Sequence, residues 1–442
     1  MKDLTRGNPL KLMILFTVPI LIGNLFQQLY NLIDTVIVGQ TLGIHALAAV
    51  GATAPITGLI IGFAVGITNG FAVVIARFFG ANDLKQMRKA VAGTIILGLA
   101  TSTVLTIIGV LSAKPMLALL NTPQEVVKPA YDFIIVMILG VTFSMLYNMQ
   151  AGILRALGDT KSPLFFLSIS TVVNIALDYL FILNFKMGIQ GAAFATILSQ
   201  LLSAVLCFIY ILKAYPILKL EKEDFKINLA MASELYSTGL SMGLMLSVVS
   251  IGTVVLQNAI NDFGTTTIAA HTAARKISEI LMLPISTLGV TAATFSSQNF
   301  GAKKPDRIKK GLKIVIIVSW GWSTLCVLAA YTIVPLVISG ITGTSQTEVI
   351  NIAARYLRID TPFYYVLGIL IIVRSALQGI GQKLIPIIAS FIELFGKVAA
   401  AYYLAPRLGY FGICITEPVI WIACTAFLGF GIFKHKLFNQ IQ

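Results

Sequence analysis

The sequence predicts an all-α polytopic membrane protein, with about twelve transmembrane helices in two homologous six-helix lobes related by a pseudo-two-fold axis along the membrane normal. The first observation behind this fold class is the composition. The chain has 442 residues, of which 57% are hydrophobic and only 11% are charged. A soluble protein carries roughly 25% charged residues. No hydrophilic stretch is long enough to fold as a separate soluble domain.

The second observation is the recurrence of apolar runs of about 20 residues, each long enough to span a hydrocarbon core of roughly 30 Å. The first run continues past Val36 and lacks a small-residue cleavage site, so we interpret it as a retained helix rather than a signal peptide. Hydropathy predicts spans at residues 10–38, 46–78, 90–113, 126–152, 163–185 and 189–213, and then at 234–261, 267–299, 311–338, 348–379, 384–405 and 409–433.

The third observation is an internal repeat. FFGANDLKQMRKA begins at Phe78 and NFGAKKPDRIKKG begins at Asn299, which is an offset of 221 residues. RALGDTKSP ends at Pro163 and QGIGQKLIP ends at Pro386, which is an offset of 223 residues. Two homologous halves that enter the membrane from the same side and flank a cavity are typical of transporters. The predicted parts are an N-lobe at 1–213, a cytoplasmic linker at 214–233 and a C-lobe at 234–442.

The loops between the predicted spans differ in charge. Basic residues gather in the loops of one side, whereas the loops of the other side hold only Lys114, Lys128, Lys186 and Arg407. The positive-inside rule therefore predicts a multi-pass protein of the cell membrane with both termini in the cytoplasm. The same rule accounts for the net charge of +14, so no nucleic-acid partner is expected.

Two acids lie inside strongly apolar spans, where an ionised carboxylate is costly and indicates a functional site. They are Asp34 and Asp178. Gln27 and Asn31 precede Asp34 at helical spacings that place all three on one face, and Asn174 lies one turn before Asp178. The alternative interpretation is that each acid is a buried hydrogen-bond partner between two helices.

These side chains, together with Thr196, offer the oxygen ligands that a hard cation such as Na⁺ prefers. A Na⁺ site at Asp34, Asp178 and Asn174 is therefore one prediction. The two acids can instead bind and release protons, because burial and a neighbouring negative charge both favour the neutral carboxyl group. The sequence leaves the choice between H⁺ and Na⁺ open.

Six stretches spread over the chain resemble the multidrug and toxic compound extrusion (MATE) family, in its prokaryotic branch with an acidic site in the N-terminal half. The resemblance implies cation-driven export, often of amphipathic organic cations, by alternating access between two lobes. The stretches are VPILIGNLFQQLYNLIDTVIVGQTLG (18–43), ALAAVGATAP (46–55), ARFFGANDLKQMRKAV (76–91), ILRALGDTKSP (153–163), NIALDYLF (174–181) and AAHTAARKI (269–277).

The resemblance also implies particular roles for residues of the first half. Proline inside a helix removes a backbone hydrogen bond and favours a kink. In this family the first helix bends at a proline that corresponds to Pro19, so Pro19 is a candidate conformational hinge. The residues that match the family's cation and proton site are Gln27, Asp34, Asn174, Asp178 and Thr196.

The second half does not copy the two acids. The repeat offsets set Val255 opposite Asp34 and Ala401 opposite Asp178. A spanning helix therefore does not need the acid in order to fold, which favours a functional role for Asp34. It also predicts that ion coupling is confined to the N-lobe.

The second half has charged residues of its own. Arg275 and Glu279 are spaced i, i+4, as are Glu393 and Lys397, which predicts internal ion pairs that stabilise the lobe. The alternative is a basic cavity wall that accepts an anionic substrate. The candidate cavity charges are Arg275, Lys276, Glu279, Arg358 and Lys397.

The predicted function is that of a secondary antiporter, coupled to H⁺ or Na⁺, that exports amphipathic organic cations. The alternative is a flippase or exporter of an anionic lipid-linked or amphiphilic substrate. The sequence has no catalytic Ser or His constellation, metal-ligand cluster or phosphate-binding loop, so we expect neither enzyme activity nor a cofactor other than the coupling ion. The expected partners are a small amphipathic substrate and the lipid bilayer, and the expected state is a monomer.

Overall fold

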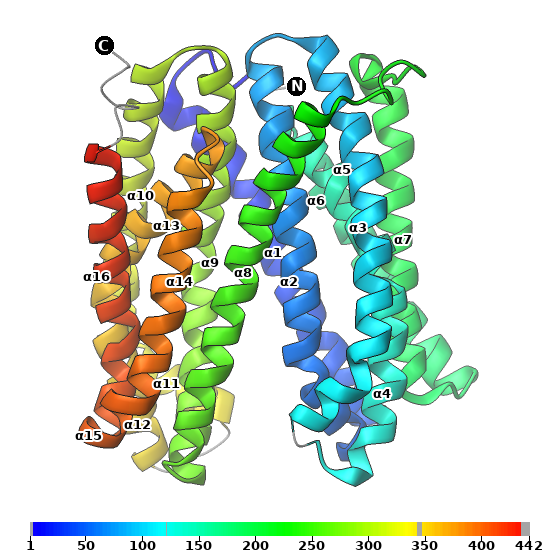
Figure 1. The fold of residues 1–442 in the computed structure, drawn as a ribbon. Helices are drawn as coiled ribbons and strands as arrows, with labels where there is room; N and C mark the ends of the chain where they lie inside the picture. The colour runs from blue at the N-terminus through cyan, green and yellow to red at the C-terminus, as the bar shows by residue number, and fades with distance from the viewer. Residues whose placement is uncertain (1–2, 121, 343–346, 435–442) are drawn as a thin grey trace. The chain divides into compact units, whose positions relative to one another are not determined.

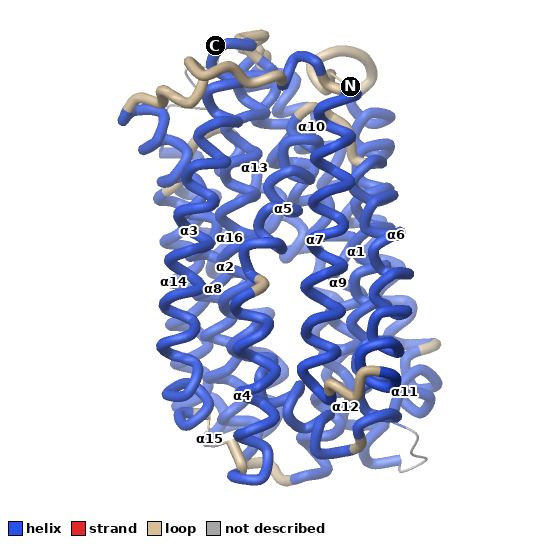
Figure 2. Tube along the Cα trace, turned by 90° about the vertical axis from the view of Figure 1, so that its right-hand side faces the viewer, coloured by secondary structure: helices blue, strands red, loops and turns tan. Residues whose placement is uncertain are grey.

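The computed structural model describes residues 3–120, 122–342 and 347–434. Helices dominate this part of the chain, and none of the residues described forms a strand (Figure 2). Eleven of the helices described are long and apolar enough to cross a membrane, and a bent helix pair supplies a twelfth span. The predicted all-α fold with about twelve spans is confirmed.

The chain forms two compact units, which we call unit 1 and unit 2. Unit 1 contains the chain up to Leu4 and Ile14–Ser247, and unit 2 contains Thr5–Met13, which includes the first residues of the first helix, together with the chain from Val248 onward. The division between them lies inside a helix, whereas the sequence repeat divides the chain before that helix. The helices of unit 1 are α1 (Pro9–Leu42), α2 (Ile44–Gly80), α3 (Leu84–Leu119), α4 (Gln124–Leu139), α5 (Val141–Ala156), α6 (Lys161–Tyr179), the π-helical η1 (Leu180–Asn184), α7 (Gly188–Ala214), η2 (Pro216–Leu218) and the first part of α8 (Leu229–Asn261).

Unit 2 continues α8 and holds the second set of helices. In unit 1, α7 packs against α5 and α5 packs against α3, as Figure 1 shows. In unit 2, α9 packs against α10, α12 and α13, and α16 packs against α13 and α14. These helices are α9 (Thr265–Gly301), α10 (Pro305–Thr332), α11 (Val334–Thr342), α12 (Thr347–Asp360), η3 (Thr361–Phe363), α13 (Tyr364–Gly379), α14 (Leu384–Ala399), the π-helical η4 (Ala400–Leu404), α15 (Ala405–Leu408) and α16 (Tyr410–Lys434).

The predicted repeat reappears in the backbone of the two halves. Helices α2 and α9 are both 37 residues long, and each follows a glycine with φ 84°, namely Gly43 and Gly264. Beyond their ends, Asn82 and Lys303 both adopt the left-handed conformation, with φ 59° and 56°. The two positions also lie 221 residues apart, so the homology of the two halves is confirmed at the level of local structure.

The predicted span at 126–152 is the one that bends. Helices α4 and α5 meet at an angle of 43°, and Gly140 lies at the break. A side-chain Cβ atom at Gly140 would collide with Ile197 of α7. Glycine therefore allows α7 to approach the break, and kinks commonly occur at such positions.

The backbones of α2 and α8 approach each other so closely that only glycine fits at the points of contact. A Cβ atom at Gly66 would lie 2.5 Å from Cα of Gly243, and a Cβ atom at Gly70 would lie 2.5 Å from Cα of Gly239. Small residues four positions apart on both helices are typical of tight helix packing in membranes. Near the same contact, Arg77 of α2 donates a hydrogen bond of 2.8 Å to Glu234 of α8.

We expect Gly70→Ala to lower the free energy of unfolding by about 1–3 kcal/mol, because the added methyl group forces two backbones apart. Gly58→Ala on the same helix is the matched control, since a Cβ atom there meets nothing within 4 Å. Alanine also has the higher helix propensity, so the control variant should be as stable as the wild type or more so. Unfolding of both variants in detergent micelles tests the contact, and equal stability of the two would contradict it.

Candidate functional site

The candidate site of unit 1 is built by three helices. Helix α6 places Asn174 and Asp178 one turn apart, and both side chains are completely buried. Helix α7 packs along α6 and contributes Thr196, and α1 contributes Asp34. Residues that the sequence predicted to form one site are thus brought to one region of unit 1.

Asp34 and Asp178 lie within hydrogen-bonding distance of each other. Oδ1 of each carboxyl group is buried and has no hydrogen-bond partner among the described residues. A carboxylate can only accept hydrogen bonds, so two facing carboxylates need a proton or a cation between them. This arrangement makes the pair suited to binding a positively charged ion.

Asn174 links the acid pair to α7. With its amide nitrogen turned toward Asp178, it donates to Oδ2 of that residue at 3.2 Å, and its oxygen accepts from the backbone nitrogen of Thr196 at 3.2 Å. The nitrogen and the oxygen of its side-chain amide then each have a hydrogen-bond partner. This contact holds one oxygen of Asp178 in place and leaves the other available to an ion.

Tyr30 belongs to the same site, although the sequence analysis did not select it. Its hydroxyl donates to Oγ1 of Thr196 at 3.0 Å, which joins α1 to α7. Tyr30 lies three residues after Gln27 and four before Asp34, so the same spacing that selected those residues also places Tyr30 on their face. An aromatic side chain in an apolar run does not by itself indicate a functional site, because such residues are common there.

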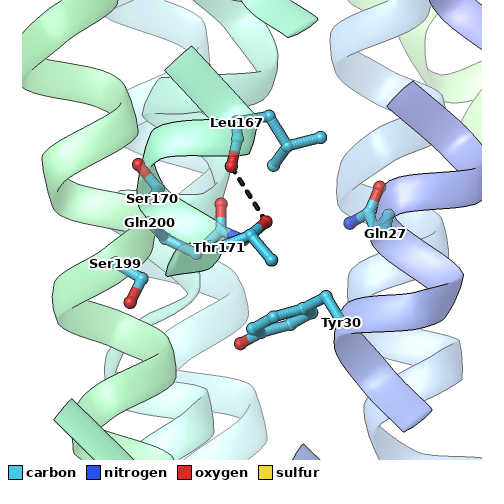
Figure 3. A pocket seen from close by; sticks show the side chains of 7 residues that line it. All are labelled: Gln27, Tyr30, Leu167, Ser170, Thr171, Ser199 and Gln200. Atoms are coloured by element: carbon cyan, nitrogen blue, oxygen red, sulfur yellow. Dashed lines mark hydrogen bonds between the residues drawn. The ribbon is translucent and has the colours of Figure 1, made fainter. Parts of the chain in front are cut away.

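A small pocket adjoins this site (Figure 3). It has a volume of about 260 Å³ including its open mouth. Figure 3 shows Gln27 and Tyr30 projecting from α1 toward Thr171 of α6. Six of the seven lining residues carry a hydroxyl or amide group, and none of the seven is charged. The lining residues are Gln27, Tyr30, Leu167, Ser170, Thr171, Ser199 and Gln200.

Two further predicted residues of α1 lie outside this arrangement. The side chain of Asn31 is exposed, whereas Asp34 is half-buried. The polar side chains of α1 therefore extend beyond the residues that form the site. Pro19 is buried within α1, which continues as a helix on both sides of it.

The donor set of unit 1 suits a light, hard cation or a proton rather than a transition metal. Among the residues described, no three His, Cys, Asp or Glu side chains gather to hold a metal ion. Two carboxylates, one amide and two hydroxyl groups remain as possible oxygen ligands. Such ligands are preferred by hard cations.

Unit 2 contains a buried network of alternating charges. Nζ of Lys397 on α14 lies 3.2 Å from Glu393 of the same helix and 3.3 Å from Glu417 of α16. Arg374 of α13 lies 3.5 Å from Glu393, and Arg275 of α9 lies 3.6 Å from Glu417. The predicted pair of Glu393 and Lys397 is confirmed. Each of the three basic groups contacts at least one of the two acids, so they do not form an unpaired positive wall.

The remaining predicted charges of unit 2 lie apart from this network. Glu279 pairs with Lys276 at 3.3 Å on an exposed surface, so the predicted pair of Arg275 with Glu279 is wrong. Arg275 instead uses Glu417, which the sequence analysis missed. Arg358 lies over the ring of Tyr331, at 5.5 Å from its centroid.

Comparisons with known proteins agree with this architecture. The MatE family model matches residues 19–180 and 241–403, which are the two halves of the repeat. The probable multidrug resistance protein YoeA of Bacillus subtilis is 27% identical and covers 96% of this chain and 93% of its own length. The probable multidrug resistance protein YpnP of the same organism is 30% identical and covers 69% of this chain and 68% of its own.

A solved structure shares the whole fold. It is the outward-facing conformation of a multidrug resistance MATE family transporter of the MOP superfamily, with a TM-score of 0.91 and 24% identity. The match covers 100% of this chain and 98% of that chain. A polytopic helical chain with a buried pair of acids is typical of a membrane transporter. The chain belongs to the MATE family of membrane transporters.

Proposed function

We propose that the protein is a secondary antiporter, driven by H⁺ or Na⁺, that exports amphipathic organic cations by alternating access. The observation that carries this proposal is the buried contact of Asp34 with Asp178, where each acid keeps one oxygen without a hydrogen-bond donor. A transporter needs a site that is stable only when an ion occupies it. The names of the two Bacillus relatives support a drug-like substrate.

In the proposed cycle, the ion controls how α1 packs against α6. A proton shared by Asp34 and Asp178 supplies the donor that both acids lack, and a bound Na⁺ neutralises both carboxylates. Without the ion, two like charges face each other in a buried place and repel. Binding of the ion to the two acids therefore favours one arrangement of α1, and release of the ion favours another. Substrate is exchanged for the ion if it binds the second arrangement more tightly.

The neighbours of the acid pair transmit this change. Tyr30 and Thr196 join α1 to α7 through one hydrogen bond, and Asn174 joins α6 to α7. Pro19 removes one backbone hydrogen bond from α1, which lowers the cost of bending that helix. We propose that α1 bends at Pro19 when the ion enters or leaves.

The same proposal covers location and partners. The charge difference between the loops supports a cell-membrane protein with both termini in the cytoplasm. The coupling ion is the only cofactor proposed, the substrate is a small amphipathic molecule, and the protein works as a monomer in the bilayer. The ion pairs of Arg275 and Lys397 with acids weigh against the alternative of an anionic, lipid-linked substrate.

The test is transport of an organic-cation dye into or out of proteoliposomes under an imposed H⁺ or Na⁺ gradient. We expect at least one of the two gradients to drive the dye with the wild type, and Asp34→Asn to lose most of this movement under both gradients. Asp262→Asn is the matched control, because it makes the same change at an exposed turn and should transport normally. Absence of dye movement under both gradients would contradict the drug-export proposal, and full coupling in Asp34→Asn would contradict the mechanism.

A further inference from the structure

Asp360 is a second completely buried acid, and it has no part in the proposed function. It is the last residue of α12 and is 0% exposed. Ser278 of α9 donates a hydrogen bond of 3.1 Å to its Oδ2, and the same hydroxyl lies 2.7 Å from the hydroxyl of Tyr364. Oδ1 of Asp360 has no hydrogen-bond partner in the part of the chain that the structure describes.

The three cations of the buried network near Asp360 are already paired with other acids. Arg275, the cation that faces it, pairs with Glu417. Lys397 lies between Glu417 and Glu393, and Arg374 pairs with Glu393. Two acids therefore hold all three cations of the network. No ion pair of Asp360 is found among the described residues, although an ionised carboxylate in a buried place needs one.

The groups that face Asp360 come from every neighbouring element. Arg275 and Ser278 face it from α9, Tyr356 faces it from α12 and Tyr364 from α13. Glu417 and Cys414 face it from α16, and α10 contributes Cys326, beside Tyr364. Among the described groups, one cation thus faces two acids, Asp360 and Glu417.

We propose that Asp360 is a proton-binding site of unit 2, and that loss of its proton draws Arg275 away from Glu417. The carboxyl proton is released to water, and the resulting carboxylate takes the guanidinium group of Arg275 as its partner. Arg275 already lies 3.5 Å from the hydroxyl of Tyr356, which is one helical turn before Asp360. Glu417 keeps Lys397 at 3.3 Å, so neither acid is left without a cation.

This inference goes beyond the proposed function, because it adds a proton site that does not involve Asp34 or Asp178. It also contradicts the sequence-based expectation that ion coupling is confined to the first half. The two halves would then use different acids for a similar purpose. A partner exchange at Arg275 would alter the contacts among α9, α12 and α16.

The proposal is tested by infrared difference spectroscopy of the full-length protein in lipid, recorded as the pH changes. The readout is the carbonyl stretch of a protonated carboxyl group. Asp34→Asn and Asp178→Asn are combined as the background, so that the acids of unit 1 are silent. We expect a pH-dependent carboxyl band to remain in this background and to disappear when Asp360→Asn is added. A background without such a band, or a band that survives Asp360→Asn, overturns the proposal.

Two further variants test the exchange of Arg275. Glu417→Gln removes the competing acid, so Arg275 should pair permanently with Asp360 and the band should be lost. Glu393→Gln is the matched control at the far end of the network, and it should leave the band unchanged. Ser278→Ala should shift the frequency of the band, because its hydroxyl contacts Asp360. Ser278→Ala also tests the proposal if Asp360→Asn does not fold. A carboxyl band whose frequency is unchanged in Ser278→Ala overturns the proposal.

Discussion

Lys397→Met is expected to lower the free energy of unfolding by about 1.5–3 kcal/mol, because Glu393 and Glu417 each lose the shorter of their two ion pairs and keep only an arginine. The Lys397 side chain is 2% exposed, and those of Glu393 and Glu417 are each 7% exposed. Methionine keeps the length and flexibility of the side chain, so the variant removes the charge with little change in packing. Denaturant-induced unfolding in micelles, followed by a thiol-reactive dye, measures the loss, because Cys207, Cys326, Cys414 and Cys424 are all buried.

Lys276→Met is the control for this prediction. Its side chain is 68% exposed, and its pair with Glu279 should contribute only about 0–1 kcal/mol. Equal losses for the two lysine variants would contradict a buried network.

The sequence predicted the spans and the repeat well, because both depend on the local order of residues. Hydropathy needs no knowledge of tertiary contacts, and a repeated turn keeps its conformation wherever it is placed. Gly43 and Gly264 illustrate this point, since their matching φ angles follow from matching sequence. The bend at Gly140 was not predicted, because it depends on Ile197 in another helix.

The partners of the charged residues were only half predictable. The i, i+4 rule found the pair of Glu393 and Lys397, which lie on one helix. It could not find Glu417 as a partner of Arg275, because those residues are 142 positions apart and meet only through tertiary packing. The same rule wrongly paired Arg275 with Glu279, since two side chains at suitable spacing can each find a better partner elsewhere.

The site of unit 1 was predicted in outline but not in detail. Asp34 and Asp178 stood out because acids are rare in apolar spans, and the structure brings them together. Tyr30 gave no such signal, although its hydroxyl contacts Thr196. Asn31 gave a signal but its side chain is exposed. Residue type therefore identifies the acids, whereas only the packing of α1 decides which neighbours reach them.

Asp34→Asn and Asp178→Asn are each expected to reduce gradient-driven transport by about 5–150-fold, and the double variant should transport no worse than either single one. The range corresponds to a coupling free energy of about 1–3 kcal/mol between ion and substrate. In the proposed mechanism one ion occupies both acids, which contact each other, so removing either acid removes the whole site. Residues that act as a unit give strongly non-additive effects. Initial rates of dye movement in proteoliposomes measure all three variants.

Asn31→Ala is the control for this cycle, because it alters an exposed polar side chain on the same helix and should transport at the wild-type rate. Multiplicative losses in the double variant would show that each acid binds its own ion, since independent sites contribute additive free energies. Asp34 and Asp178 would then be two separate proton sites that lie next to each other. A shared ion instead requires that the first substitution already abolishes coupling, whichever acid is replaced.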